Sequence, residues 1–394
     1  MAGNLNQIYF DHAATTPMVQ PAIAALTNQI LKTGNASSLH STGRSVRKEL
    51  EEAREAIAKA AGCVASEIIF TGSGTEADNL AIKGLYWLGA KSGKKTIITS
   101  TFEHHAVMDP IKWLADHEGA TVIAISVSKA GEIDLNQLRQ AVEKYGSQTA
   151  LISIMHANNE IGSIQPIGEI VKIAGDIPVH TDAVQSFGKV DFNFEALGLT
   201  AATISAHKVG GPLGVAALIL RKCLDIEPVL HGGGQERDIR SGTFNAPGII
   251  SFAAAATDAI ANQKDREVKI RALKELLINK VLTAVPDAWV NGKSEKRLPG
   301  IANITFPGTD SEGLLLLLDM NGIACSTGSA CSAGVHRPTH VLLALGATED
   351  EATSSLRFSI SHTNTEAEIE KLASVIGDVV AKSRAATSKK VFSS

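Results

Sequence analysis

The sequence has few cysteines, few aromatic residues and no long apolar run. Its 394 residues include 4 cysteines, 3 tryptophans and 3 tyrosines. Four cysteines in a chain of this length do not form a disulfide framework, and they lack the paired spacing of a structural zinc site, so we expect no metal. These features predict a reduced, cytoplasmic protein in which an exposed cysteine has a chemical role.

The charge pattern and the hydropathy exclude two classes of partner. The 37 basic and 41 acidic residues give a net charge of −4 without a basic block, whereas nucleic-acid binding needs a concentrated positive field. The longest apolar stretches, such as Leu314–Leu318 and Val215–Leu220, are far shorter than a membrane span. The first residues also lack the basic segment and apolar core of a secretory signal. We therefore expect no nucleic-acid partner and no membrane association.

Helical and strand patterns alternate through the first two thirds of the chain. Apolar residues recur every three to four positions over 43–62, which predicts an amphipathic helix ending at Gly62. The predicted strands are 67–71, 96–100, 121–126, 149–154, 178–181, 202–205 and 214–220, and further helices are predicted at 75–89, 106–118, 134–145 and 166–174. Strands interleaved with helices indicate an α/β fold with a mainly parallel sheet covered on both faces.

The pattern changes after Pro247. A long Ala-rich helical stretch at about 248–285 precedes predicted strands at 301–306 and 355–360 and predicted helices at 311–320, 338–345 and 365–383. A chain of this length favours two domains. We predict a large domain of residues 13–260 and a smaller α+β domain formed by residues 1–12 and 261–394.

The first polar cluster, Thr71–Asn79, places a Gly-rich turn between a strand and a helix. Free backbone N–H groups and the helix dipole then converge, which suits a phosphate group. The dinucleotide fingerprint is incomplete, because Ala77 occupies the position of its third glycine. By itself the cluster is explained equally well by a structural turn.

Two more clusters follow strands, where open α/β sheets bind their ligands. Asp182, with Gln185 three residues later, could cap a helix or hold a pyridine nitrogen protonated. Lys208 follows Ser205-Ala206-His207 and precedes two glycines, so it is either a surface charge or an uncrowded amine for a Schiff base. Phosphate cradle, carboxylate and lysine in this order predict a pyridoxal 5'-phosphate (PLP) enzyme with its cofactor on Lys208.

The chain resembles the cysteine desulfurases of the NifS/IscS type, within the class-V aminotransferase family and the fold-type-I PLP enzymes. The resemblance extends from Tyr9 to about Asn364. The matching motifs are 10–17, 34–38, 71–79, 103–107, 158–162, 182–185, 205–208, 232–237, 240–243 and 328–331.

The resemblance implies roles for particular residues. Lys208 carries PLP as a Schiff base, Asp182 pairs with the ring nitrogen, and Gln185 binds its phenolic oxygen. His104 is then stacked on the ring as a second acid/base, and Asn159 with Arg357 orients the substrate. The protein is then a homodimer in which Thr243 reaches the cofactor phosphate of the other subunit. The phosphate site within one subunit consists of Gly74, Thr75, Ser205 and His207. Without the family, His104 could be a helix cap or a core residue, and Arg357 a surface ion pair.

The segment from Cys325 to Arg337 is rich in small and polar residues and predicts a functional loop. The resemblance makes Cys331 the nucleophile that takes sulfur from L-cysteine as a persulfide, releases L-alanine and passes the sulfur to an acceptor such as an iron–sulfur scaffold. Cys325 could resolve that persulfide, pair with Cys331 or be buried at a strand end, and burial is favoured. Cys63 and Cys223 are expected to be small core residues.

Two positions depart from the family pattern. Ala36 replaces the proline of Gly-Asn-Pro-Ser-Ser, and Ser361-His362 replaces a Gly-Arg pair, so the substrate carboxylate is expected to rely on Arg357. An aminotransferase would not need the Cys331 loop, whereas a selenocysteine lyase could use the same loop. A non-catalytic sulfur carrier would not need Lys208, Asp182 and His104 together.

Overall fold

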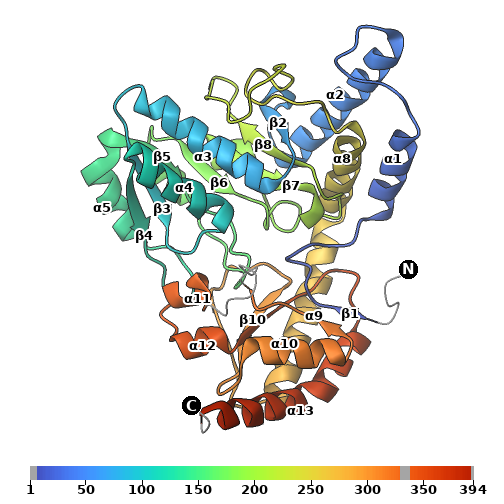
Figure 1. Ribbon diagram of the computed structural model, residues 1–394, viewed down its shortest axis with the longest axis vertical. Coiled ribbons are helices and arrows are strands. Elements are labelled where there is room, and N and C mark those ends of the chain that lie inside the picture. Colours follow the sequence, from blue (N-terminus) through green and yellow to red (C-terminus); the bar gives the residue numbers. More distant parts are fainter. Residues whose placement is uncertain (1–6, 329–337, 392–394) are drawn as a thin grey trace.

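The computed structural model describes residues 7–328 and 338–391. At its centre is a seven-stranded sheet in the order β2-β8-β7-β6-β5-β3-β4 (Figure 1). The strands are β2 (Ile68–Thr71), β3 (Thr96–Ser100), β4 (Thr121–Ile125), β5 (Thr149–Ser153), β6 (Val179–Asp182), β7 (Ala201–Ser205) and β8 (Ala216–Leu220). Only β8 runs against its neighbours within this sheet. The predicted mainly parallel sheet is confirmed.

Helices cover both faces of this sheet because successive strand residues point to opposite sides. Ile97 packs with helices α3 (Gly74–Ala90) and α4 (His105–Glu118), whereas Ile98 packs in a separate apolar cluster on the other face. That second face is covered by α2 (Ser41–Ala61), α5 (Leu135–Tyr145), α6 (Ile167–Ala174) and α8 (Ala246–Ala261). Helix α1 (Gln20–Ile30) packs against α8, and the short α7 (Phe194–Leu197) follows β6.

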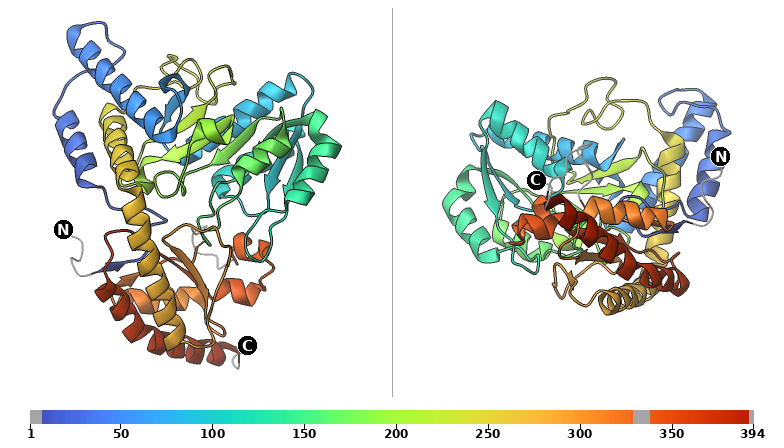
Figure 2. Two further views of the ribbon diagram at one scale, coloured as in Figure 1. Left: turned by 180° about the vertical axis from the view of Figure 1, so that it is seen from behind. Right: turned by 60° about the horizontal axis from the view of Figure 1, so that its bottom comes forward.

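The Ala-rich stretch predicted at 248–285 forms two helices rather than one. Helix α8 ends at Ala261, Asn262 lies outside the helical region, and α9 runs from Gln263 to Ala284. Figure 1 shows α8 and α9 passing in succession from the large sheet into the lower part of the molecule, and Figure 2 shows the same column from behind. The two helices therefore connect the two layers of the protein.

The lower part contains two small sheets. Strands β10 (Ile301–Thr305), β12 (Ser355–Ser359) and β9 (Trp289–Val290) form an antiparallel sheet. Strand β1 (Ile8–Tyr9) pairs in parallel with β11 (Ile323–Ala324), which ties the amino-terminal segment to this layer. The helices here are α9, α10 (Ser311–Met320), α11 (His340–Ala344), α12 (Glu349–Thr353) and α13 (Glu366–Val391).

The parallel strands bring several chain segments to one edge of the large sheet. Strands β2, β3, β5, β6 and β7 run in the same direction, so their carboxyl ends lie along the edge where open α/β sheets bind ligands. No helix in the described ranges is long and apolar enough to cross a membrane.

Candidate active site

Each residue predicted to contact a cofactor bound to the same subunit lies at the end of or after a strand that ends at the carboxyl edge of the large sheet. Gly74 and Thr75 follow β2, His104 follows β3 and Asn159 follows β5. Asp182 is the last residue of β6, with Gln185 in the turn beyond it, and Ser205 ends β7, with Lys208 in the 3₁₀ turn that follows. The topology alone therefore gathers residues that are more than 130 positions apart in the chain.

The start of α3 forms a close-fitting cradle. A Cβ atom at Gly74 would lie 3.2 Å from Val184 Cγ2 and 3.7 Å from Ser205 Cβ, so the backbone approaches the ends of β6 and β7 closely. Ser73 caps the helix by accepting from the Glu76 amide at 3.1 Å. The first amides of a helix have no intrahelical acceptor. The amides of Gly74 and Thr75 are therefore suited to a phosphate.

Asp182 is a buried carboxyl group. Its Oδ1 accepts a hydrogen bond from the Val184 amide at 2.9 Å, which closes the turn after β6. Burial raises the pKa of Asp182, whereas the charges of His104 and Lys208 act in the opposite direction. A cationic group bound against Asp182 would keep it ionised.

Lys208 points at the amino-terminal segment. Its Nζ donates to the carbonyl oxygens of Ala13 at 2.6 Å and Ala14 at 2.7 Å. Burial, together with the charge of Arg357, lowers the pKa of Lys208 to about 8. A substantial fraction of this amine is therefore neutral near pH 8, as a nucleophilic lysine requires. Burial also lowers the pKa of the neighbouring His207 to about 4, so that imidazole is neutral.

His104 caps α4, which is the structural alternative that its position after a strand suggested. Its Nδ1 accepts from the Ala106 amide at 3.1 Å. Nδ1 is thus the acceptor nitrogen, and the proton of the neutral ring lies on Nε2. Burial lowers the pKa of His104, while Asp182 raises it. The cap fixes the ring within range of the charges of Asp182 and Lys208.

Arg357 is buried and lies on β12, in the opposite layer. Its guanidinium donates to Asp11 Oδ1 at 2.7 Å and to the Asn159 carbonyl oxygen at 3.0 Å. Its Nε is buried without a hydrogen-bond partner in the described part of the chain. A surface ion pair is therefore the wrong description, since this guanidinium retains buried donors for a further acceptor.

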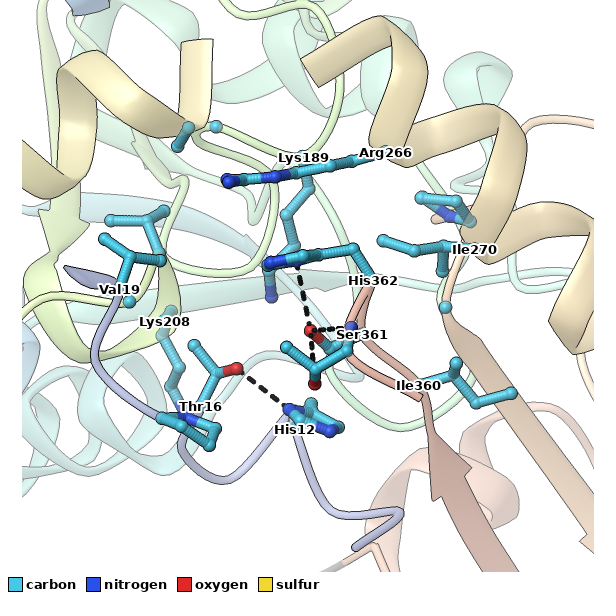
Figure 3. A pocket seen from close by; sticks show the side chains of 18 of the residues that line it. His12, Thr16, Val19, Lys189, Lys208, Arg266, Ile270, Ile360, Ser361 and His362 are labelled. Carbon is cyan, nitrogen blue, oxygen red and sulfur yellow. Dashed lines mark hydrogen bonds between the residues drawn. The ribbon is translucent and has the colours of Figure 1, made fainter. Parts of the chain in front are cut away.

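A cavity of about 460 Å³ adjoins Lys208, between the amino-terminal segment, the α8–α9 junction and the residues after β12. In Figure 3, Lys189, Lys208 and His12 lie around this cavity together with Ser361 and His362. Ser361 Oγ and His362 Nδ1 are 3.3 Å apart. The pair that replaces Gly-Arg therefore lines this cavity.

A model of the aminotransferase class-V family matches residues 8–372. The chain belongs to this family. Among its relatives, an IscS-like cysteine desulfurase of Mycobacterium tuberculosis is 45% identical over 96% of this chain and 97% of the relative.

Solved structures agree with this membership. A NifS-like protein superimposes with a TM-score of 0.89 at 34% identity, over 95% of this chain and all of that one (100%). SspA, solved in complex with cysteine, gives a TM-score of 0.79 at 32% identity, over 91% of this chain and 100% of SspA. The predicted resemblance to NifS/IscS-type enzymes and the fold-type-I architecture are confirmed, and the cofactor of this class-V chain is PLP.

The site fits PLP on its own geometry. The α3 cradle suits a phosphate, the buried carboxyl of Asp182 has only one hydrogen bond among the described residues, and Lys208 offers an amine of lowered pKa. These three chemical features match the phosphate, the ring nitrogen and the aldehyde carbon of the cofactor.

Some predicted residues stay outside this constellation. Thr243 is exposed and Cys331 lies outside the described residues. Cys325 is buried, as favoured, and burial raises its pKa above the usual range. The expectation for Cys223 is wrong, since this residue is exposed in the turn after β8, and Cys63 is only half-buried after α2.

Four contributors were not singled out from the sequence. Asp11 and the carbonyls of Ala13 and Ala14 belong to the amino-terminal motif that supported the resemblance, so a signal for them existed. Lys189 had none, because a lone lysine four residues after Gln185 is indistinguishable from a surface charge.

Proposed function

We propose that this chain is a PLP-dependent cysteine desulfurase that converts L-cysteine to L-alanine and transfers the sulfur to Cys331 as a persulfide. The observation that carries the proposal is the meeting of Lys208, Asp182 and His104 at one sheet edge, with Arg357 facing them from the other layer. The names of the relatives and the cysteine bound in the SspA structure support the choice of substrate.

The chain's own residues would hold the cofactor at defined points. Lys208 binds it covalently, Asp182 holds the ring nitrogen and Gln185 the phenolic oxygen. The phosphate contacts are the amides of Gly74 and Thr75 with the side chains of Ser205 and His207. When bound, PLP supplies an electron sink for the bonds to the substrate's Cα and Cβ atoms.

Arg357 and Asn159 orient the substrate. A guanidinium binds a carboxylate through two parallel hydrogen bonds, which a lysine cannot reproduce. Asp11 and the Asn159 carbonyl hold the guanidinium of Arg357 in place. The α-carboxylate of L-cysteine would bind there.

Protons and sulfur move between side chains and substrate. The substrate amine would displace Lys208 Nζ from the cofactor, and the freed lysine amine then removes the Cα proton, with His104 Nε2 as the second proton donor. The Cys331 thiolate attacks the substrate sulfur, so that a Cβ–S bond breaks and an S–S bond forms. The substrate carbon takes up a proton, and the products are L-alanine and the Cys331 persulfide. No external oxidant is needed.

We further infer the assembly and the fate of the sulfur. The division into residues 13–260 on one side and 1–12 with 261–394 on the other is supported by separate apolar clusters around the large sheet and around β10 and β12. The exposure of Thr243 is compatible with a contact to the cofactor phosphate of a second subunit. A cytoplasmic homodimer would pass its persulfide to an acceptor protein such as an iron–sulfur scaffold.

The test is to supply the holoenzyme with L-cysteine and to measure alanine and protein-bound persulfide in the same samples. Wild-type protein should form both in equal amounts in the first turnover, and Cys331→Ser protein should form neither while retaining the absorbance of bound PLP. Alanine formation that persists in Cys331→Ser would refute the sulfur-transfer step. Turnover of selenocysteine with none of cysteine would instead make the chain a selenocysteine lyase.

A further inference from the structure

Lys189 is a half-buried residue whose amine the proposed mechanism does not use. It lies in the turn after β6 and lines the cavity beside Lys208 (Figure 3). Burial and the positive charges of Lys208 and Arg357 lower the pKa of Lys189 to about 7. Within residues 7–328 and 338–391, no ion pair includes this amine. Such a lysine needs either a polar acceptor or an anion to offset its burial.

The acceptor that the structure provides is Gln185. Lys189 Nζ donates to Gln185 Oε1 at 2.9 Å, and Gln185 Nε2 donates to the Ala13 carbonyl oxygen at 2.8 Å. That same carbonyl accepts from Lys208 Nζ at 2.6 Å. Lys189, Gln185, Ala13 and Lys208 thus form one continuous hydrogen-bonded chain.

This row of hydrogen bonds determines which way the Gln185 amide points. While Lys189 is protonated, a flipped amide would set its oxygen against the Ala13 carbonyl and its NH₂ group against an ammonium that has no lone pair, so both hydrogen bonds would be lost. In the observed orientation, one of the two Nε2 hydrogens is used by Ala13. The other has no acceptor among the described residues, and it is the donor that a phenolic oxygen would require.

We propose that Lys189 is a positioning residue for PLP. Lys189 fixes the Gln185 amide as a donor to the phenolic oxygen of the cofactor, and the charge of Lys189 polarises that donor. The inference rests on the proposed contact between Gln185 and the cofactor.

The charges that act on Lys189 are those of Lys208 and Arg357, and burial, helped by the charge of Lys189, lowers the pKa of His12 and of His207 to about 4. Two carboxylates, Asp258 and Glu267, line the same cavity, but each pairs with an arginine at 2.7 Å and neither forms an ion pair with Lys189 in the described ranges. The oxygens of PLP would therefore supply the negative charge that Lys189 lacks.

The experiment uses Lys189→Met in the holoenzyme. The first readout is the pH midpoint at which the absorbance of the bound cofactor changes. Loss of a nearby positive charge should raise this midpoint by about 1 pH unit, because the charge favours loss of a proton from the chromophore. The second readout is equilibrium PLP binding to the apo-protein, which should weaken by about 5- to 10-fold.

Two variants separate positioning from a general loss of a lysine. Lys189→Arg keeps the donor and the charge and should restore most of the shift. Lys274→Met is the matched control, because Lys274 on α9 is buried, has a pKa lowered to about 8 and lies near Glu275, Arg271 and Arg297, outside the site. It should leave the midpoint unchanged. If Lys189→Met does not fold, Lys189→Gln takes its place in the same comparison.

A Gln185→Ala background tests whether the effect passes through the amide. There, Lys189→Met should shift the midpoint by less than half as much as in the wild-type background. An equal shift in both backgrounds, or a midpoint in Lys189→Met that matches the Lys274→Met control, refutes the positioning role. Absence of a bound-cofactor band in the wild-type protein would refute the proposed function instead, so the two failures are distinguishable.

Discussion

Replacing Arg357 by Gln tests the proposed substrate contact most directly. The guanidinium is buried on β12, held by Asp11 and by the Asn159 carbonyl, and retains a buried Nε–H without a partner. A bidentate carboxylate would receive two charge-assisted hydrogen bonds, each contributing about 1.5–2 kcal/mol. Their loss, about 3–4 kcal/mol in total, corresponds to a fall in kcat/KM of about 10²- to 10³-fold.

The assay compares L-cysteine with cysteamine, which lacks the α-carboxylate. The wild-type enzyme should discriminate strongly between the two in kcat/KM, and Arg357→Gln should remove most of that discrimination. Arg357→Lys keeps the charge but not the planar pair of donors, so its loss should be intermediate. Asp11→Asn, which leaves the guanidinium but weakens its anchor, should cost about tenfold or less.

Arg357 does not contact the cradle, so the absorbance of bound PLP should be retained in all these variants, and this checks that the proteins are folded. Arg357 does not bind the substrate carboxylate if Arg357→Gln lowers kcat/KM for L-cysteine by less than about threefold. An equal loss in kcat/KM for L-cysteine and for cysteamine would likewise show that Arg357 does not recognise the carboxylate.

Three further predictions concern single groups. Asp182 has a raised pKa in the folded protein, so its ionisation destabilises the fold as the pH rises. Asp182→Asn should therefore stabilise the apo-protein against urea, more at pH 9 than at pH 5, and it should lower kcat at least about 100-fold. The rate of PLP incorporation into apo-protein should increase with pH up to about 8 and then level off, because Lys208 reacts as the neutral amine; a rise that continues towards pH 10 would contradict this. Arg54→Met should destabilise the protein by about 3–5 kcal/mol in urea unfolding, because the buried Glu236 carboxylate loses its two hydrogen bonds from Arg54 at 2.8 and 2.9 Å. The double variant Arg54→Met with Glu236→Leu should recover much of this loss in stability.

The periodicity of apolar residues in the sequence was sufficient to predict most of the helices and strands. The helix predicted at 43–62 is α2, and each of the seven strands predicted between 67 and 220 is present with ends shifted by at most two residues. These elements are long or strongly apolar, so local burial alone specifies them. The short strands β1, β9 and β11 were not predicted, because two residues carry no period and exist only through their pairing partners.

The helical stretch after Pro247 shows the limit of local pattern. Its composition favours helix throughout, but α8 packs on the large sheet and α9 against α13 in the other layer, with the break at Asn262. Likewise Cys223 has an apolar strand just before it, yet the chain has left the sheet by that residue and the thiol is exposed. Side-chain type does not report where a chain turns relative to the rest of the fold.

The order of cradle, carboxylate and lysine along the chain was enough to identify a PLP site, because each chemical role demands a particular side chain after a particular kind of element. Long-range folding decided the rest. Parallel strands brought Gly74, His104, Asp182 and Lys208 to one edge, and the second layer supplied Arg357. Burial then set the pKa of Lys208 to about 8 and that of Lys189 to about 7. Desolvation and neighbouring charge depend on three-dimensional packing, so no local sequence signal could have distinguished Lys189 from a lysine on the surface.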